Sequence, residues 1–121
     1  MEHLYVIGID YGTDSVRALL ADAESGEEIA VAVCNYSRWG RGLYCDTAKS
    51  QFRQHPLDYL EGLEQVLRQV IAQCPAPEAI RAIAVDTTAS TPCLVDRTCT
   101  PLSLTAGYEE NPDAMFVLWK D

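Results

Sequence analysis

The sequence predicts an α/β fold in which antiparallel and parallel strands share one sheet. Three runs rich in apolar and β-branched residues, 4–10, 15–22 and 29–33, are separated only by short turns, which is typical of an antiparallel meander. An amphipathic helix and a further apolar strand at residues 80–85 follow. Because a helix precedes this later strand, we expect it to run parallel to the first strand, which makes the sheet mixed.

The first two strands meet at a turn that is rich in hydroxyl groups and backbone donors. Residues 11–15, Tyr-Gly-Thr-Asp-Ser, follow Asp10 directly. Backbone N–H groups in such a turn can surround a phosphate chain, and the Asp10 carboxylate suits the accompanying magnesium ion. The same composition is common in ordinary hairpin turns, so a purely structural turn is the alternative.

Composition excludes several classes of function. The 121 residues allow one domain at most, and 48% hydrophobic residues are enough to form a core. A net charge of −9 argues against nucleic acid and anionic membranes as partners. No apolar run approaches the ~20 residues that span a bilayer, and the first residues lack the features of a signal peptide. The 5 cysteines include no Cys-x-x-Cys pair, which favours free thiols in a reducing cytoplasm.

The middle of the chain is predicted to contain a long loop and then a helix. Residues 36–53 have no clear period and are expected to form a loop, either functional or held to the surface by its aromatic side chains. Pro56 at the first helical position and Asp58 in the first turn mark the start of a helix. Apolar residues at helical spacing continue to Cys74, so the helix is expected to pack across the sheet.

The later apolar strand is expected to lie in the centre of the sheet, because residues 80–85 are almost uninterruptedly apolar. It ends at Asp86, and a parallel arrangement would bring Asp86 to the same sheet edge as Asp10. Ligands bind at this edge in open α/β sheets, although Asp86 could instead only cap its strand. Short strands are expected near residues 102–104 and 114–121, and the chain is expected to be the first piece of a longer protein.

Three separated segments carry a family resemblance: residues 8–17, 84–92 and 116–121. Together they resemble the N-terminal lobe of the FGGY carbohydrate kinases, relatives of actin and the heat-shock ATPases. Within this family the likeness is greatest to the members that phosphorylate L-ribulose, and residues 42–46 and 110–115 extend it. Asp14 stands where the family usually has Thr or Ser, a departure that these members share.

The resemblance implies a ribonuclease H-like (actin-like ATPase) fold, of which residues 1–121 form the N-terminal part of the first kinase lobe. It implies transfer of the ATP γ-phosphoryl group to L-ribulose, in L-arabinose catabolism, with Mg2+ held by Asp10. The residues expected at the phosphates are Gly12, Thr13, Asp14, Ser15 and Arg17. The residues expected at the sugar are Asp86, Thr87, Thr88, Ala89, Ser90, Trp119, Lys120 and Asp121. A solvated strand position for Arg17 and a core position for Trp119 are the alternatives.

In this family the catalytic base and the glycine-rich nucleotide segment of the second lobe come later in the sequence. The isolated chain is therefore expected to be inactive, since a general base must reach the proton that it removes. Exposed edges are expected to make the fragment self-associate, and the full-length enzyme is expected to be cytoplasmic and to form a homodimer. The alternative functions are a kinase for xylulose or another polyol, and a non-catalytic interaction module of the same fold.

Overall fold

The computed structural model describes residues 3–121, which form two compact units. The first, which we call the sheet unit, contains the chain up to Asn35 and Glu61–Thr87. The second, the loop unit, contains Tyr36–Leu60 and Thr88–Asp121. No helix within residues 3–121 is long and apolar enough to cross a membrane.

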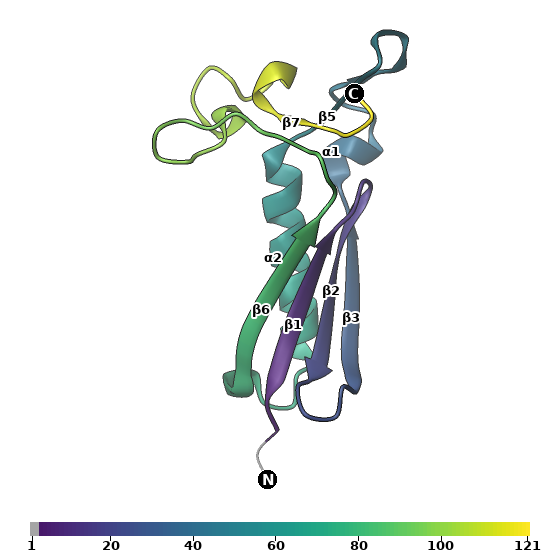
Figure 1. The fold of residues 1–121 in the computed structure, drawn as a ribbon, viewed down its shortest axis with the longest axis vertical. Coiled ribbons are helices and arrows are strands. Elements are labelled where there is room, and N and C mark those ends of the chain that lie inside the picture. Colours follow the sequence, from purple (N-terminus) through teal and green to yellow (C-terminus); the bar gives the residue numbers. More distant parts are fainter. Residues whose placement is uncertain (1–2) are drawn as a thin grey trace. The chain divides into compact units, whose positions relative to one another are not determined.

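The sheet unit contains the predicted mixed sheet, with strands in the order β3-β2-β1-β6 (Figure 1). Its strands are β1 (Tyr5–Tyr11), β2 (Ser15–Asp22), β3 (Glu28–Asn35) and β6 (Ile80–Thr87). β2 pairs antiparallel with both β1 and β3, and β6 pairs parallel with β1. The α/β class, the three-strand meander and the parallel fourth strand are therefore confirmed.

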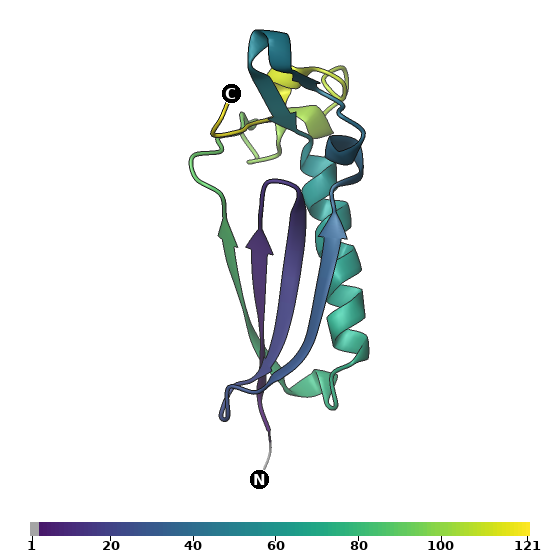
Figure 2. The same cartoon turned by 90° about the vertical axis from the view of Figure 1, so that its right-hand side faces the viewer.

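One face of the sheet is covered by the helix α2 (Pro56–Ala72), of which the part from Glu61 onward belongs to the sheet unit (Figure 2). Alternate β2 residues face this helix, and Val16, Ala18 and Leu20 are completely buried. Val66 and Val70 of α2 are completely buried too, one helical turn apart. The alternating apolar residues of β2 and the apolar stripe of α2 therefore pack against each other in one layer, as the sequence predicts.

Gly62 brings α2 unusually close to the sheet, and we expect even a small side chain there to destabilise the fold. A Cβ added at Gly62 would lie 2.7 Å from the Cγ1 atom of Val16, a buried and stiff side chain. We expect Gly62→Ala to lower the free energy of unfolding by about 1–3 kcal/mol through overpacking, despite the better helix propensity of alanine.

Urea unfolding of the chain measures this loss. Gly40→Ala is the matched control, since no heavy atom lies within 4 Å of the position that its Cβ would take. Combining Gly62→Ala with Val16→Ala should restore part of the loss, because the second change removes the methyl group that clashes. A Gly62→Ala chain at least as stable as the original would contradict the close approach.

The predicted central position of β6 is wrong: β6 is the edge strand of the sheet, paired only with β1 among the described residues. In register with β1, the side chains of Ile83 and Val85 project to the face that carries α2. They are nevertheless 53% and 60% exposed. The apolar run correctly predicts a strand. Within residues 3–121, however, no segment covers the apolar side chains of Ile83 and Val85.

The loop unit contains more regular structure than the single loop predicted for residues 36–53, and that prediction is wrong. Its elements are α1 (Ser37–Gly40), β4 (Cys45–Asp46), β5 (Gln51–Gln54) and β7 (Phe116–Val117), with β4-β5-β7 forming a small sheet. A 3₁₀ turn, Leu102–Leu104, replaces the expected strand there. Further 3₁₀ turns are Thr47–Lys49 and Pro112–Ala114, and Pro77–Ala79 lies in the sheet unit. Elements of two to four residues are too short to show a hydrophobic period.

Stacked aromatic rings form the centre of the loop unit. Tyr59 stacks on Tyr36 with ring centroids 5.3 Å apart and on Phe116 with centroids 4.5 Å apart. The Tyr59 hydroxyl donates a hydrogen bond of 2.8 Å to Oε1 of Gln54, which is 1% exposed. The buried polar group thus has its partner within the same core.

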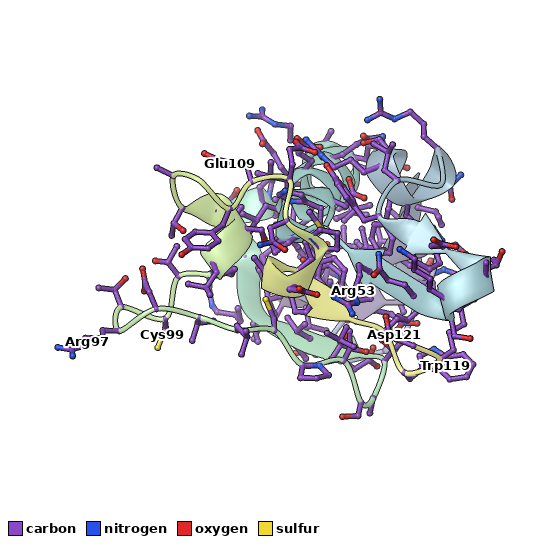
Figure 3. All side chains as sticks on the ribbon, turned by 90° about the horizontal axis from the view of Figure 1, so that it is seen from above. Arg53, Arg97, Cys99, Glu109, Trp119 and Asp121 are labelled. Carbon is purple, nitrogen blue, oxygen red and sulfur yellow. The ribbon has the colours of Figure 1, made fainter. Side chains whose placement is uncertain are left out.

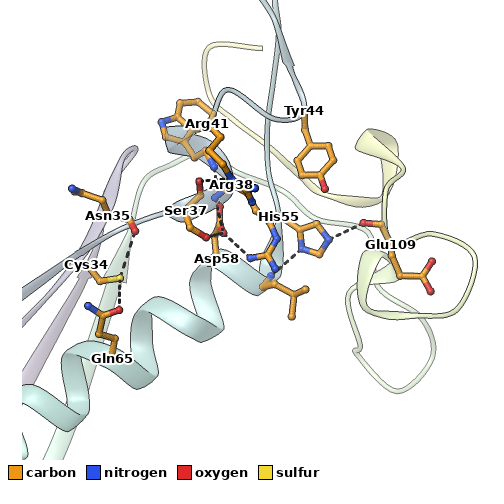
Figure 4. A network of polar contacts seen from close by, with 12 residues as sticks. Cys34, Asn35, Ser37, Arg38, Arg41, Tyr44, His55, Asp58, Gln65 and Glu109 are labelled. Atoms are coloured by element: carbon orange, nitrogen blue, oxygen red, sulfur yellow. Dashed lines mark hydrogen bonds and ion pairs between the residues drawn. The ribbon is translucent and has the colours of Figure 1, made fainter.

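A second buried polar centre is the carboxylate of Asp58, in the first turn of α2 (Figure 4). The backbone N–H groups of Arg38 and Trp39 donate to its two oxygens at 3.2 and 3.1 Å. The Arg38 guanidinium donates at 2.9 Å and the Ser37 hydroxyl at 3.4 Å. Asp58 therefore caps the N-terminus of α1 as well as lying in the first turn of its own helix, a role that the sequence did not reveal.

Candidate functional site

The ends of β1 and β6 place two aspartates next to each other. The parallel register pairs Asp10 with Asp86 and Tyr11 with Thr87. Along β1, Asp10 alternates with the buried residues that face α2, so its carboxyl group projects to the opposite face of the sheet. Asp86 is in register with Asp10 and projects to the same face. The prediction that the two strand ends emerge at the same edge is confirmed.

The pKa of the Asp86 carboxyl group is raised above its ordinary value by the neighbouring Asp10 carboxyl group, first through hydrogen bonding, then through burial and through the charge of Asp10. Two adjacent carboxyl groups resist losing both protons unless a cation lies beside them. The pair is thus suited to a divalent cation or to a shared proton.

The turn from Asp10 to Ser15 is tight. The Gly12 N–H donates to the carbonyl oxygen of Ser15 at 2.8 Å, which closes the hairpin between β1 and β2. A Cβ on Gly12 would lie 3.3 Å from the same carbonyl oxygen, so a side chain is poorly accommodated there. Thr13 and Asp14 occupy the tip, where Thr13 is half-buried and Asp14 exposed.

Arg17 of β2 is directly opposed to Asp10 of β1. With Asp86 of β6 on the other side of Asp10, the three residues form a row of charged side chains over three strands. Together Arg17, Asp10 and Asp86 border an open hollow of ≈ 320 Å³ on the uncovered face of the sheet. Gly8 and Ala84 form part of its floor, and their small size keeps it open. Arg17 is exposed, so its side chain is available to a ligand in this hollow.

The carboxyl groups of Asp10 and Asp86 suit Mg2+, which needs few protein ligands, better than a metal ion whose ligands all come from the protein. Within residues 3–121 there is no group of three or more His, Cys, Asp or Glu side chains that could hold a metal ion. Mg2+ usually keeps several waters and is bound by one or two carboxylates together with nucleotide phosphates. Asp10, with Asp86 beside it, offers hard oxygen ligands of that kind.

In the loop unit, the structure places Asp121 in an ion pair with Arg53 (Figure 3). Oδ2 of Asp121 accepts from Nε of Arg53 at 2.7 Å and from the backbone N–H of Phe52 at 2.8 Å. These donors, the guanidinium first, lower the pKa of Asp121. Arg53 also donates from Nη1 to the carbonyl oxygen of Pro112 and to Oδ1 of Asp113. Asp121 and Arg53 thus join β5 to the end of the chain.

Two further residues predicted at the sugar, Lys120 and Trp119, lie in different surroundings: Lys120 contacts aromatic rings, whereas Trp119 is exposed. The ammonium group of Lys120 lies 4.8 Å from the ring centroid of Phe52 and 5.6 Å from that of Trp39, in cation–π geometry. Trp119 is 57% exposed, and Figure 3 shows it at the periphery of the loop unit. The alternative of a core position for Trp119 is therefore wrong.

Of the remaining predicted sugar residues, Thr87 is the last residue of β6, and Thr88, Ala89 and Ser90 lie in the segment that follows it. The hydroxyl groups of Thr88 and Thr91 hydrogen-bond to each other at 2.9 Å, which holds this segment in a turn. Ala89 and Ser90 are exposed at its tip. The contributions of Arg53, Phe52 and Trp39 were missed from the sequence, because these residues contact Asp121 and Lys120 only through the tertiary fold.

Comparison with known proteins relates the chain to sugar kinases. A ribulokinase from Vibrio parahaemolyticus is 50% identical over 97% of this chain, and one from Halalkalibacterium halodurans is 37% identical over 96%. The chain spans 21% and 22% of these proteins. The crystal structure of a gluconate kinase from Lactobacillus acidophilus matches 99% of the chain and 20% of that protein, with a TM-score of 0.73 at 16% identity.

No family model matches the chain. The likeness to the gluconate kinase concerns the fold alone, whereas the ribulokinases share sequence along nearly the whole of this chain. The mixed sheet with its Asp10 turn is therefore part of the actin-like ATPase fold of the sugar kinases, and the chain is similar in sequence to ribulokinases and resembles their N-terminal part.

Proposed function

We propose that the whole protein transfers the γ-phosphoryl group of ATP to the terminal hydroxyl of L-ribulose. The observation that carries this proposal is the pairing of β1 with β6, which brings the Asp10 turn and the carboxyl groups of Asp10 and Asp86 to one sheet edge. Phosphoryl transfer depends mostly on positioning and on neutralising charge, and a rigid turn of this kind serves both. The 50% identical Vibrio protein is named a ribulokinase, which supports L-ribulose as the substrate.

The phosphates and the metal ion would be bound at the Asp10 turn. Asp10 would hold Mg2+, directly or through water, and bound Mg2+ would neutralise charge on the phosphates. The groups proposed to contact the β- and γ-phosphates are those of Gly12, Thr13, Asp14 and Ser15. Arg17, which is directly opposed to Asp10 on the neighbouring strand β2, would offset negative charge beside the transferred phosphoryl group.

The sugar would be bound by Thr87 at the end of β6, by the segment that follows it and by residues 119–121. Thr87, Thr88 and Ser90 offer hydroxyl groups to the ketose, and Ala89 would leave room for its carbon chain. The exposed Trp119 offers a flat apolar surface to a sugar face. Lys120 is already held by two aromatic rings and Asp121 by Arg53, so both would support the pocket through these fixed positions.

The experiment that tests this function is a phosphorylation assay of the full-length protein with ATP and a panel of ketoses and polyols. We expect L-ribulose to give the highest kcat/KM, and Ala89→Phe to abolish its use by filling the space near the sugar. A higher kcat/KM for xylulose or glycerol than for L-ribulose would contradict L-ribulose as the substrate and would support a kinase for that other compound. Absence of phosphorylation across the panel would favour a non-catalytic module.

The 121-residue chain alone is proposed to be inactive, because its homologues are about five times longer and a general base must reach the sugar hydroxyl. Measurable ATP-dependent phosphorylation of L-ribulose by this chain would refute the proposal. The whole enzyme is proposed to act in the cytoplasm, where ATP and reduced cysteine thiols both occur.

The isolated chain is proposed to self-associate through the open edge of β6, as dimers or by exchange of strands. Edge strands with exposed apolar residues pair readily with other chains, and Ile83 and Val85 are such residues. We expect Val85→Lys to raise the dissociation constant of the dimer by about tenfold or more, since a charge on an edge strand disfavours pairing. The whole enzyme is proposed to be a homodimer.

Analytical ultracentrifugation over a range of concentrations measures this association. Leu94→Lys is the control, because Leu94 is 62% exposed but lies outside the strands of the sheet. A monomeric chain at high concentration, or equal effects of the two substitutions, would contradict pairing through β6.

A further inference from the structure

We infer that Arg53 of β5 is a positioning residue for sugar binding: by holding Asp121 it fixes the turn at residues 118–121, and with it the direction of the exposed Trp119 ring. This inference rests on the proposed function and deepens it, because it adds to the predicted sugar set a residue that acts on the sugar only through others. Three features of the loop unit carry it: the bonds of Arg53, the anchoring of the turn, and the place of Trp119 within the turn.

The guanidinium group of Arg53 is held by acceptors from two segments of the chain. The Arg53 side chain is 13% exposed and that of Asp121 18%. Nε donates to Oδ2 of Asp121 at 2.7 Å, whereas Nη1 donates to the carbonyl oxygen of Pro112 at 2.8 Å and to Oδ1 of Asp113 at 3.0 Å. Because the guanidinium fork is planar and rigid, bonds on Nη1 also set the direction of Nε. Residues 112 and 113 therefore orient Arg53, and Arg53 orients Asp121.

The turn at residues 118–121 is anchored to β5 at both of its ends. At its start, the N–H of the buried Leu118 donates to the carbonyl oxygen of Phe52 at 3.0 Å. At its end, Oδ2 of Asp121 accepts from the N–H of Phe52 at 2.8 Å, in addition to its bond from Arg53. The Asp121 N–H donates to the carbonyl oxygen of Leu118 at 2.9 Å and closes the turn. The bond from Arg53 is the charge-assisted one among these, which makes it the strongest anchor.

Trp119 lies between the two anchored ends, and its ring is directed outward (Figure 3). The next side chain, Lys120, is directed to the rings of Phe52 and Trp39. A sugar needs the flat face of the Trp119 ring in one direction, and the backbone of the turn sets that direction. If the anchor from Arg53 is lost, a smaller fraction of the molecules has the ring in place. The apparent dissociation constant of the sugar then rises by the same factor.

Substitutions at Arg53 and at its two carboxylate partners test this role in the full-length protein. We expect Arg53→Gln to raise the KM for L-ribulose by about tenfold or more, the scale of one lost charge-assisted hydrogen bond, with kcat nearly unchanged. Arg53→Lys should raise KM less, because its ammonium group keeps the charge but lacks the fork. Asp113→Asn is the matched control: it breaks the other ion pair of Arg53, but the Asp113 side chain is 84% exposed, so KM should change by less than about twofold.

Two further measurements separate positioning from direct contact with the sugar. Arg53→Gln combined with Asp121→Asn should raise KM by less than the product of the single effects, because both substitutions break the same ion pair. Fluorine NMR of protein labelled with fluorotryptophan, recorded without sugar, reports on Trp119 itself, whose resonance is the one that Trp119→Phe removes. We expect Arg53→Gln to shift or broaden this resonance and Asp113→Asn to leave it unchanged. If Arg53→Gln does not fold by circular dichroism, Arg53→Lys takes its place in both measurements.

The inference is overturned if the KM for L-ribulose is unchanged in Arg53→Gln, or if Asp113→Asn raises it as much. It is also overturned if the effects of Arg53→Gln and Asp121→Asn multiply, since the two residues would then act independently, or if the Trp119 resonance is the same in Arg53→Gln as in the wild type. A wild-type protein that phosphorylates no ketose would instead remove the proposed function. The Trp119 resonance, measured without sugar, would still decide whether Arg53 fixes the turn.

Discussion

Replacing Asp58 by alanine is expected to lower the free energy of unfolding of the chain by about 3–5 kcal/mol. The Asp58 side chain is 0% exposed and that of its partner Arg38 only 20%. Asp58→Ala would remove the carboxylate that accepts hydrogen bonds from the Arg38 guanidinium and from the N–H groups of Arg38 and Trp39. Breaking one side of a buried, hydrogen-bonded ion pair costs more than the pair itself contributes, because the remaining charge stays poorly solvated.

Urea unfolding monitored by circular dichroism and by tryptophan fluorescence measures this loss, since Trp39 lies beside the substituted residue. Asp46→Ala is the matched control: Asp46 also caps a short helical turn, through a bond of 3.0 Å to the Ala48 N–H, but its surroundings are exposed. We expect this control to cost about 1 kcal/mol. Equal losses in the two variants would show that the burial of Asp58 contributes nothing beyond capping.

Replacing Asp10 by asparagine in the full-length protein is expected to lower kcat by about 100-fold or more, on the scale found when one preorganised electrostatic group is lost. The amide has the shape of the carboxyl group and can donate a hydrogen bond to the opposed Asp86, so the local structure should persist. What disappears is the negative charge that would hold Mg2+ against the phosphates. The KM for L-ribulose should change little, because the sugar is proposed to bind elsewhere.

Steady-state kinetics at increasing Mg2+ concentrations tests this expectation, and partial recovery at high Mg2+ would be characteristic of a weakened metal site. Glu24→Gln removes one negative charge from the turn between β2 and β3, and so controls for the net charge of the protein. A normal kcat for Asp10→Asn, or a loss confined to the KM for L-ribulose, would contradict the proposed role of Asp10.

The pairing of Asp10 with Asp86 could be predicted from sequence because it follows from general rules of topology. A strand, a helix and a second strand place the two strand ends at one edge, and both runs end in aspartate. The edge position of β6 could not be predicted by the same means. An apolar run such as residues 80–85 indicates how much burial a strand requires, but not which segment supplies it.

The side-chain contacts of the loop unit were beyond sequence reasoning for a different reason. Asp58 contacts residues 19 and 20 positions away, and Asp121 contacts residues 68 and 69 positions away. Local periodicity and turn composition contain no information on such pairs. The same applies to Lys120, whose aromatic neighbours come from β5 and α1.

The hairpin that carries the Asp10 turn is formed by β1 and β2, which are the two inner strands of the four-stranded sheet. Each of these strands is hydrogen-bonded on both sides, so shifting the hairpin tip along the sheet would require breaking two ladders at once. We therefore expect the hairpin to keep its position in the sheet when a ligand binds at its tip, and amide hydrogen exchange to be slowest in these two strands.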